Sequence, residues 1–587
     1  MSANNQTGSL LSDSNIQNRV YSLKSTVAKS SDTISAKEYI IPVFLCISLI
    51  VACVIYASKT YFWNDELFSY FFLADPSFSH MWAAFHDKLN NTPPLYFMLG
   101  WGWSQLFGAS ELSLKLFSCL GIGIAGIITW VTLRRTYGFW ATSLSVLAVF
   151  CLSDMVISQN AEARMYGLYL ALSAAGIWLY DEINCREQLG WKILLINALV
   201  QAALVNTHLH GCFFSGAILA AFMVNDYFHK RARVKLYASF ILGWLTFLFY
   251  IPALLIQMDA GNPDSWIPIP KVRYLLDVLS LSTVSTRYFP GALVLLPKTA
   301  FFFIMAILPG FYIFKNQPRL SGNIKFKEQQ DLQTQSAKSL LILAYLFLAV
   351  PIGVWVFSWV IKPIFWDRYV LPTVLAWPIL FASLLTLLKV EFVRYAQTLK
   401  NSQLYEFIPS RKTAIGAAGI LVLMLAMPVV EAIQAPAGEL PGQYDKKIGY
   451  AHLPVVIPFP HDFMERMHYS PDKERYFTLL DWEVALDTTS GHMAPQFYKH
   501  LEAWKRSYPD IFANQITTTE DFLSKHKQFL VLGFAMDEPC KCSRPKTVYN
   551  GFCDRWMYMR VVGNPLYNVR ALGDNGGHRY FLVEAKQ

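Results

Sequence analysis

Long runs of apolar residues constrain this chain more than any other feature. Residues 415–430 form one such run and contain no charged side chain. A helix needs about 20 apolar residues to cross about 30 Å of hydrocarbon, and one water-soluble core does not bury many such runs. Hydrophobic residues make up 54% of the 587 residues and charged residues only 16%, whereas soluble domains usually carry about 25%. The sequence therefore predicts a polytopic α-helical membrane protein and argues against a disordered or wholly soluble chain.

The apolar runs predict about 11 transmembrane helices. They lie at 39–57, 112–133, 141–159, 168–181, 193–209, 212–228, 236–257, 292–314, 339–360, 370–388 and 413–433. Residues 39–433 are thus expected to form a transmembrane domain. Residues 1–38 are polar and rich in Ser, Asn and Thr, without the apolar core and cleavage site of a signal peptide. We expect them to form a disordered cytoplasmic tail.

The placement of Lys and Arg predicts the orientation. These residues concentrate in alternate short loops, such as 134–135 and 230–235, and cytoplasmic loops carry such an excess. The N-terminus is therefore expected in the cytoplasm and, with an odd number of spans, the C-terminus outside. The net charge of +9 follows from these loops and does not indicate a nucleic-acid partner.

A shorter apolar stretch at 93–108 interrupts the pattern. Counting it as a span would reverse the charge pattern of every later loop. Its residues Trp101, Trp103 and Tyr96 suit the headgroup region, so the stretch is expected to be a helix at the outer interface. The first outer loop, 58–111, is then long and structured.

Residues 434–587 have the composition of a soluble domain. Apolar segments at 453–459, 475–481 and 529–534 predict short buried strands, and helical patterns separate them. Segments 567–572 and 578–585 flank a predicted hairpin turn at 574–577. The sequence therefore predicts an extracytoplasmic α/β domain.

Charged residues are nearly absent from the middles of the predicted spans, which argues against an ion-coupled transporter. They gather at the outer ends instead. The first group, Trp63 to Glu66, directly follows the first span. Asp65 is a candidate general base for a hydroxyl. The alternative is structural, with Asn64 or Asp65 capping a helix and Glu66 in its first turn.

Two further groups carry Arg on the outer side, against the charge rule. They are EARMY at 162–166 and DRYVLP at 367–372. Arg164 and Arg368 could each hold a phosphate by paired hydrogen bonds. The alternative is an interfacial ion pair, either Glu162 with Arg164 or Asp367 with Arg368.

No metal site is predicted from the sequence. His208 and His210 could bind a metal, but a structural role is favoured. Cys553 could form a disulfide with Cys540 or Cys542 in an oxidising exterior. A zinc site with His578 is the weaker alternative.

In this order, the motifs resemble those of GT-C glycosyltransferases that use polyprenyl-phosphate sugars. The nearest branch is the group of protein O-mannosyltransferases and lipid A aminoarabinose transferases. The resemblance covers roughly 39–390. It rests on Asp65-Glu66, PPLYF at 93–97, FGASELSLK at 107–115, EARMY and DRYVLP. Two positions depart from the family pattern, since Thr92 stands where His is frequent and Lys115 where Arg is common.

The resemblance implies an enzyme that transfers a sugar from a polyprenyl-phosphate donor to an extracytoplasmic hydroxyl or amine, with inversion. It implies Asp65 as the base, and Arg368 together with Arg164 and Tyr166 on the carrier phosphate. Tyr96 and Glu162 are expected beside the substrate. Glu66 is expected either to orient the acceptor or to assist a divalent cation, the one cofactor considered.

The expected location is the bacterial inner membrane, with membrane lipid and a glycan, lipid or protein acceptor as partners. The sugar and the acceptor stay open, because pocket shape decides both. A non-enzymatic flippase, transporter or sensor of lipid-linked sugars is the competing class. A transferase that moves another group from a lipid phosphate is the second alternative.

Overall fold

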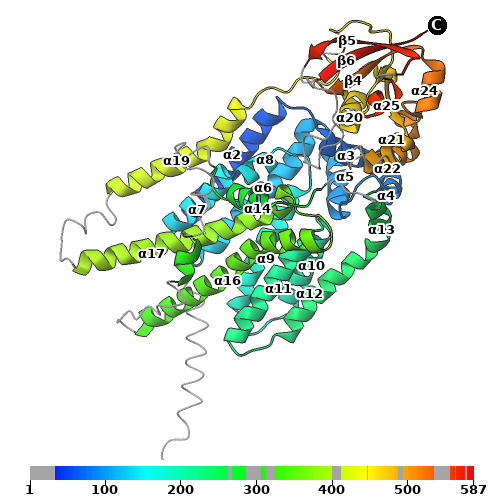
Figure 1. The fold of residues 1–587 in the computed structure, drawn as a ribbon. Helices are drawn as coiled ribbons and strands as arrows, with labels where there is room; N and C mark the ends of the chain where they lie inside the picture. Colours follow the sequence, from blue (N-terminus) through cyan, green and yellow to red (C-terminus); the bar gives the residue numbers. More distant parts are fainter. Residues whose placement is uncertain are drawn as a thin grey trace, which may run out of the picture.

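The structure is a computed structural model in which a bundle of long helices carries a mixed β-sheet beyond one end (Figure 1). It describes residues 34–261, 267–285, 300, 304, 306–311, 324–398, 411–443, 445, 447–486, 494–534, 555–561, 564–575 and 578–586.

Where the structure describes the predicted apolar runs, they form helices of the bundle. Its α-helices are α2 (Ile40–Ala57), α6 (Glu111–Arg134), α7 (Phe139–Leu152), α8 (Asp154–Gln159), α9 (Tyr166–Asn184), α10 (Trp191–Val205), α11 (Gly211–Phe228), α12 (Val234–Leu245), α13 (Ile251–Asp259), α14 (Val272–Leu281), α16 (Ile324–Val360), α17 (Ala376–Thr398) and α19 (Arg411–Gln434). The 3₁₀ helices are η1 (Ala36–Tyr39), η2 (Thr246–Phe249) and η4 (Asp367–Leu375).

Six helices among the described residues are long and apolar enough to cross a membrane, or seven if one bent pair counts as a span. The count of 11 stays a prediction, because the run at 292–314 lies largely outside the described residues.

Two predicted spans are broken in the structure. The run at 141–159 divides at Ser153, whose backbone is extended (φ −83°, ψ 125°) and whose hydroxyl donates to the Leu281 carbonyl over 3.0 Å. The run at 236–257 bends by 54°. Pro252 lies in the first turn after this bend, where its missing N–H and fixed φ suit a helix start. Hydrophobicity alone does not reveal either break.

The bundle is held by close helix contacts. Gly121 on α6 and Gly167 on α9 let the two backbones meet, since a Cβ added at Gly167 would lie 1.8 Å from the Ser118 carbonyl oxygen. The last helix, α19, returns to pack on the first, α2. There the Ser48 hydroxyl donates to the Leu425 carbonyl over 2.5 Å.

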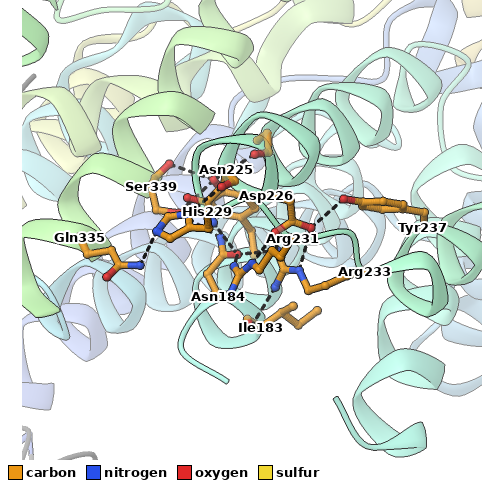
Figure 2. A network of polar contacts seen from close by, with 12 residues as sticks. Ile183, Asn184, Asn225, Asp226, His229, Arg231, Arg233, Tyr237, Gln335 and Ser339 are labelled. Carbon is orange, nitrogen blue, oxygen red and sulfur yellow. Dashed lines mark hydrogen bonds and ion pairs between the residues drawn. The ribbon is translucent and has the colours of Figure 1, made fainter. Parts of the chain in front are cut away.

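A buried carboxylate ties α11 to α12 through the short loop between them. Figure 2 shows Asp226 facing two arginines of this loop. Asp226 accepts from Arg231 Nε (2.8 Å), Arg233 Nε (2.9 Å) and the Tyr237 hydroxyl (2.7 Å). Arg233 also donates to Asn184 of α9 over 2.8 Å. Because the carboxylate and both guanidinium groups are mutually satisfied, this network is structural.

The segment predicted as the first outer loop, residues 58–111, contains three short helices, α3 (Asn64–Leu73), α4 (Phe78–Phe85) and α5 (Leu95–Phe107), and it keeps that name below. Helix α5 is the helix predicted at 93–108. The Nε1 group of Trp101 donates to the Asp75 carbonyl over 2.8 Å, which joins α5 to the end of α3.

The C-terminal residues form a six-stranded mixed sheet of order β3-β2-β1-β4-β6-β5. Its strands are β1 (Val455–Val456), β2 (Tyr476–Leu480), β3 (Ile516–Thr518), β4 (Gln528–Phe534), β5 (Tyr567–Asn575) and β6 (His578–Ala585). Its helices are α20 (Pro460–Tyr469), α21 (Trp482–Leu486), α22 (Ala494–Ser507), α23 (Pro509–Phe512), α24 (Thr519–Lys525) and α25 (Arg555–Arg560), with the 3₁₀ turn η5 (Lys473–Arg475). Strands β1 to β4 pair in parallel, and β6 pairs antiparallel with β4 and β5.

The sequence does not predict strand β3, because three residues are too few to show an alternation of apolar and polar side chains. Of the predicted turn, Gly576 and Gly577 lie outside the described residues, as do Cys540, Cys542 and Cys553.

The sheet region packs on the first outer loop through aromatic rings. Trp504 of α22 is fully buried and stacks on Phe68 of α3, with ring centroids 5.6 Å apart. The Tyr508 hydroxyl lies 3.2 Å from the Asp75 carboxylate at the end of α3. Helix α3 is thus clamped between the bundle and the sheet region.

Candidate functional site

Helix α3 begins where the chain leaves the first span, and its first turn carries Asp65 and Glu66. Glu66 is 2% exposed. One of its carboxylate oxygens accepts from the Trp63 amide (3.2 Å) and the other from the Ala163 amide (2.7 Å). Glu66 therefore caps α3 and ties it to the turn that precedes α9. Asp65 does not cap the helix, because its side chain points to another partner.

That partner is Arg368, which η4 presents at the start of the tenth predicted span. Arg368 Nη2 lies 2.6 Å from Asp65 Oδ2, and Arg368 Nη1 lies 3.6 Å from Glu162 Oε1. The Asp65 and Arg368 side chains are only 22% and 15% exposed. The sequence suggested an ion pair of Glu162 with Arg164 or of Asp367 with Arg368, but the contacts differ. Glu162 faces Arg368. The Asp367 carboxylate accepts from the Arg368 backbone amide (2.7 Å).

Arg164 lies against the same turn of α3. Its Nη1 group donates to the Asp65 carbonyl and to the Ser69 hydroxyl, each over 2.9 Å. The backbone of Arg164 is fixed from α6, since the Ser118 hydroxyl donates to its carbonyl over 2.6 Å. The close contact between α6 and α9 thus positions this guanidinium group.

Aromatic rings surround the cationic side of the cluster. The guanidinium carbon of Arg368 lies 5.0 Å from the Trp63 ring centroid and 5.9 Å from that of Tyr166. Tyr166 and Tyr96 are each 1% exposed. The Tyr96 ring packs 5.8 Å from that of Phe117 on α6. The apolar rings lower the local dielectric constant and so strengthen the charge interactions beside them.

The three acids of the cluster differ in protonation. Burial raises the pKa of Asp65, but the charges of Arg368 and Arg164 outweigh burial and hold the pKa below its ordinary value. Burial raises the pKa of Glu66 to about 7, although Lys115 opposes this. Burial also raises the pKa of Glu162 to about 7. At neutral pH Asp65 is therefore ionised, while Glu66 and Glu162 are each partly protonated.

Several buried donors of the cluster have no hydrogen-bond acceptor among the described residues. They are Arg164 Nε, Arg368 Nε and the Tyr166 hydroxyl. Unsatisfied buried polar groups cost free energy, so these donors suit an anion that enters from outside the chain. A phosphate offers acceptors with the geometry that guanidinium groups match.

A cavity of about 430 Å³ adjoins the cluster. Glu66, Glu162 and Trp63 line it on the cluster side, and Lys115 of α6 lines it as well. Lys115 is 1% exposed, and its ammonium group donates to the Thr60 hydroxyl over 2.8 Å. The cluster and cavity together resemble a substrate site more than an ion-pair contact.

Comparison with known proteins identifies the fold that carries this cluster. No protein-family model and no curated protein matches the sequence. Among solved structures, ArnT from Cupriavidus metallidurans bound to undecaprenyl phosphate matches with a TM-score of 0.52 at 11% identity. The match covers 93% of this chain and 98% of that chain. The chain has the GT-C fold.

Two further structures match less well. ArnT from the same organism in the apo state gives a TM-score of 0.49 at 12% identity, over 93% of this chain and 98% of that chain. The oligosaccharyltransferase AglB from Archaeoglobus fulgidus, in complex with an inhibitory peptide and a dolichol-phosphate, gives 0.42 at 10% identity, over 85% and 70%.

Within this GT-C fold, the predicted site residues converge. The structure brings Asp65, Glu66, Glu162, Arg164 and Arg368 into one cluster. Tyr166 lies in its shell, and Tyr96 lies close enough for the charges of Arg164, Glu66 and Glu162 to act on its pKa.

The two histidines considered as metal ligands lie beside this cluster, with the His208 ring 5.9 Å from that of Tyr166. His208 Nδ1 accepts from the His210 amide over 3.0 Å, and the ring stacks on Tyr169 at 4.8 Å. Within the described residues, no group of three or more His, Cys, Asp or Glu side chains is arranged to hold a metal ion.

Sequence analysis singled out only Trp63, Glu66, Lys115 and Glu162 among the residues that line the cavity, and it missed two polar ones that matter below. Gln159 of α8 and Glu465 of α20 both line the cavity. Glu465 lies far in sequence from the lining residues of the bundle and the first outer loop, within a segment that has the pattern of an ordinary amphipathic helix. No signal in the sequence separates it from a surface glutamate.

Proposed function

We propose that this protein is an integral-membrane glycosyltransferase that moves a sugar from a polyprenyl-phosphate carrier to an extracytoplasmic acceptor hydroxyl or amine. The observation that carries the proposal is the half-buried pair of Asp65 and Arg368, with unpartnered guanidinium donors beside a cavity. The likeness in fold to ArnT bound to undecaprenyl phosphate supports the choice of carrier. The inner membrane of a bacterium is the proposed location, with the site on the extracytoplasmic side.

The proposed chemistry needs one base. The acceptor oxygen or nitrogen attacks the anomeric carbon, and its proton passes to the Asp65 carboxylate. The bond between that carbon and the phosphate oxygen breaks, with inversion at the carbon, and the carrier phosphate leaves. Because a phosphate is a good leaving group, it needs no protonation by an acid, unlike the leaving groups of hydrolytic glycosidases. Base catalysis of this kind is typically worth about 10² to 10⁴ in rate.

Arg368 and Arg164 are the proposed phosphate ligands. In the structure Arg368 neutralises Asp65 over 2.6 Å. A carrier phosphate competes for that guanidinium group and leaves the Asp65 carboxylate available to the acceptor proton. The unpartnered Nε donors of both arginines then stabilise the growing charge of the phosphate.

Glu66 is proposed as a positioning residue, because two backbone amides hold its carboxylate. It orients α3 and, through α3, the base. Adding a chelator to the assay described below would test whether turnover needs a divalent cation.

The test is a donor panel on purified protein in lipid. Wild type and Asp65→Asn are incubated with several undecaprenyl-phosphate sugars and membrane extract, and free undecaprenyl phosphate is measured. We expect wild type to release the carrier from one preferred sugar and Asp65→Asn to release it at least about 10²-fold more slowly. Binding of bare undecaprenyl phosphate should survive in the variant.

Asp87→Asn is the matched control. Asp87 belongs to the same outer loop and pairs with the exposed Arg506 over 2.9 Å, and such surface pairs are worth little. Its release rate should equal that of wild type. Full activity of Asp65→Asn would remove Asp65 from the chemistry.

A further inference from the structure

The cavity beside the cluster is closed by the C-terminal part of the chain. Residues Gly438, Glu439 and Pro441 and, from α20, Glu465 form the wall opposite the bundle. The remaining wall comes from the end of α2, residues 60–63, the start of α3, α6, α8 and residues 161–162. The sheet region is thus part of the site as well as a neighbour of it.

This wall is fixed at two points. The Gly438 amide donates to the Lys59 carbonyl over 2.7 Å, which ties the segment after α19 to the end of α2. At the other point, Tyr469 of α20 accepts from the Phe62 amide (2.7 Å) and donates to Glu111 (2.8 Å). Helix α20 is therefore anchored to the entry of α3 and to the start of α6, which carries Lys115.

The lining has the chemistry of a carbohydrate site. Tyr56, Tyr61 and Trp63 offer aromatic faces, and Glu66 and Glu465 offer carboxyl groups. Sugar rings present C–H faces that pack on aromatic rings, and hydroxyl groups that hydrogen-bond to carboxyl and amide oxygens. A cavity of about 430 Å³ falls in the size range of small-ligand sites.

One further atom points to a ligand. Gln159 is 7% exposed and lines the cavity, and its Oε1 has no hydrogen-bond donor among the described residues. A buried amide oxygen without a donor costs free energy, and a sugar hydroxyl would supply that donor. Burial raises the pKa of Glu465 to about 7, so its carboxyl group can donate or accept at neutral pH.

We propose that this cavity binds a sugar ring and that Glu465, supplied by the C-terminal region, hydrogen-bonds its hydroxyls and determines sugar selectivity. The proposal rests on the glycosyltransferase function proposed above. The sugar is either that of the lipid-linked donor or one of a saccharide acceptor, since both present the same hydroxyl chemistry.

Binding measurements separate these two sources. In the donor arm, affinities for bare undecaprenyl phosphate and for undecaprenyl phosphate linked to a hexose, a pentose or an N-acetylhexosamine are compared. In the acceptor arm, protein loaded with bare undecaprenyl phosphate is titrated with deacylated lipopolysaccharide. Both arms use wild type, Glu465→Gln and Gln159→Leu, with Glu474→Gln as the exposed control on the same region.

We expect Glu465→Gln and Gln159→Leu to weaken the sugar-dependent binding about tenfold in one of the two arms. The arm that is affected shows whether the bound sugar belongs to the donor or to the acceptor. Affinity for bare undecaprenyl phosphate should not change, and it also reports that the variants fold. Glu474→Gln should match wild type in both arms.

Two results would overturn the proposal. One is sugar-dependent binding that neither variant weakens, and the other is wild type that gains no affinity from a sugar in either arm. Neither arm needs turnover, so failure of the glycosyltransferase function would appear separately, as absent carrier release in the donor panel.

Discussion

At the scale of single residues, the Asp65–Arg368 contact joins the two groups that the proposed chemistry needs. Burial raises the pKa of Asp65, but the charges of Arg368 and Arg164 outweigh burial, so the proposed base is ionised at neutral pH and, on this proposal, is masked until a phosphate competes for Arg368. The same Arg368 faces Glu162 at 3.6 Å. An ionised Glu162 attracts the Arg368 guanidinium group and therefore weakens the binding of a phosphate to it.

This gives a prediction for the pH dependence of carrier binding. Burial raises the pKa of Glu162 to about 7, so Glu162 is neutral below pH 7 and ionised above it. An ionised Glu162 competes with the phosphate for Arg368. We therefore compare the affinities of wild type and Glu162→Gln for undecaprenyl phosphate. As the pH rises from 6 to 8, we expect the ratio of the wild-type affinity to the variant affinity to fall by roughly threefold to tenfold.

Titration calorimetry in detergent at several pH values would measure this ratio. The phosphate and Glu66 also titrate in this range, but they do so in both proteins, so the ratio isolates Glu162. Parallel pH profiles for the two proteins would show that Glu162 does not ionise beside Arg368.

At the scale of elements, the helices and the site were predictable to different extents. Apolar runs predicted α2, α6, α11 and α19 because length and composition alone decide a span. Charges at outer helix ends marked Asp65, Arg164 and Arg368 as candidates, and the resemblance to GT-C motifs then favoured them over their structural alternatives. The break at Ser153 could not be predicted, since it depends on a hydrogen bond to Leu281 from a distant part of the chain.

The contact between α6 and α9 gives a second prediction. A Cβ at Gly167 would lie 1.8 Å from the backbone oxygen of Ser118, and backbone cannot move aside as a flexible side chain can. Gly167→Ala should therefore separate α6 from α9 and displace Arg164, which Ser118 holds. Overpacking usually costs about 1 to 3 kcal/mol, and we expect this variant at or above the upper end.

Thermal unfolding in detergent, followed by tryptophan fluorescence, would measure the loss, and the yield of folded protein would report a variant too unstable to melt. Gly216→Ala is the matched control. Gly216 also lies in a bundle helix, α11, but nothing lies within 4 Å of an added Cβ, so its melting temperature should be unchanged or slightly raised. Equal behaviour of the two variants would mean that the helices can part at Gly167 without cost.

At the scale of the whole molecule, the site forms where three distant parts of the chain meet. The bundle supplies the arginines, the first outer loop supplies Asp65, and the C-terminal region supplies the far wall of the cavity. Sequence analysis predicted strands in that region, but it could not predict that α20 and α22 lie on α3. Such a contact depends on the path of the whole chain and leaves no local pattern.

Substitution of Trp504 would test whether the packing of the C-terminal region on α3 supports carrier release. Its ring is fully buried and packs on Phe68 and Phe71 of α3, with centroids 5.6 and 5.1 Å away. Truncating a buried Trp usually costs about 3 to 5 kcal/mol. In Trp504→Ala we expect α3 to loosen, because it loses its cover, and carrier release to fall about tenfold or more while the spans stay folded.

Hydrogen exchange of α3 together with the carrier-release assay would follow both effects. Trp482→Ala is the control, because Trp482 lies in the same C-terminal region and bonds to Glu502 over 3.0 Å, with its ring against Tyr498 of α22 at 5.6 Å. It should weaken the sheet region yet leave exchange in α3 near that of wild type. If Trp504→Ala keeps both slow exchange in α3 and full carrier release, the bundle alone holds Asp65 in place, and the C-terminal region acts only through the cavity wall.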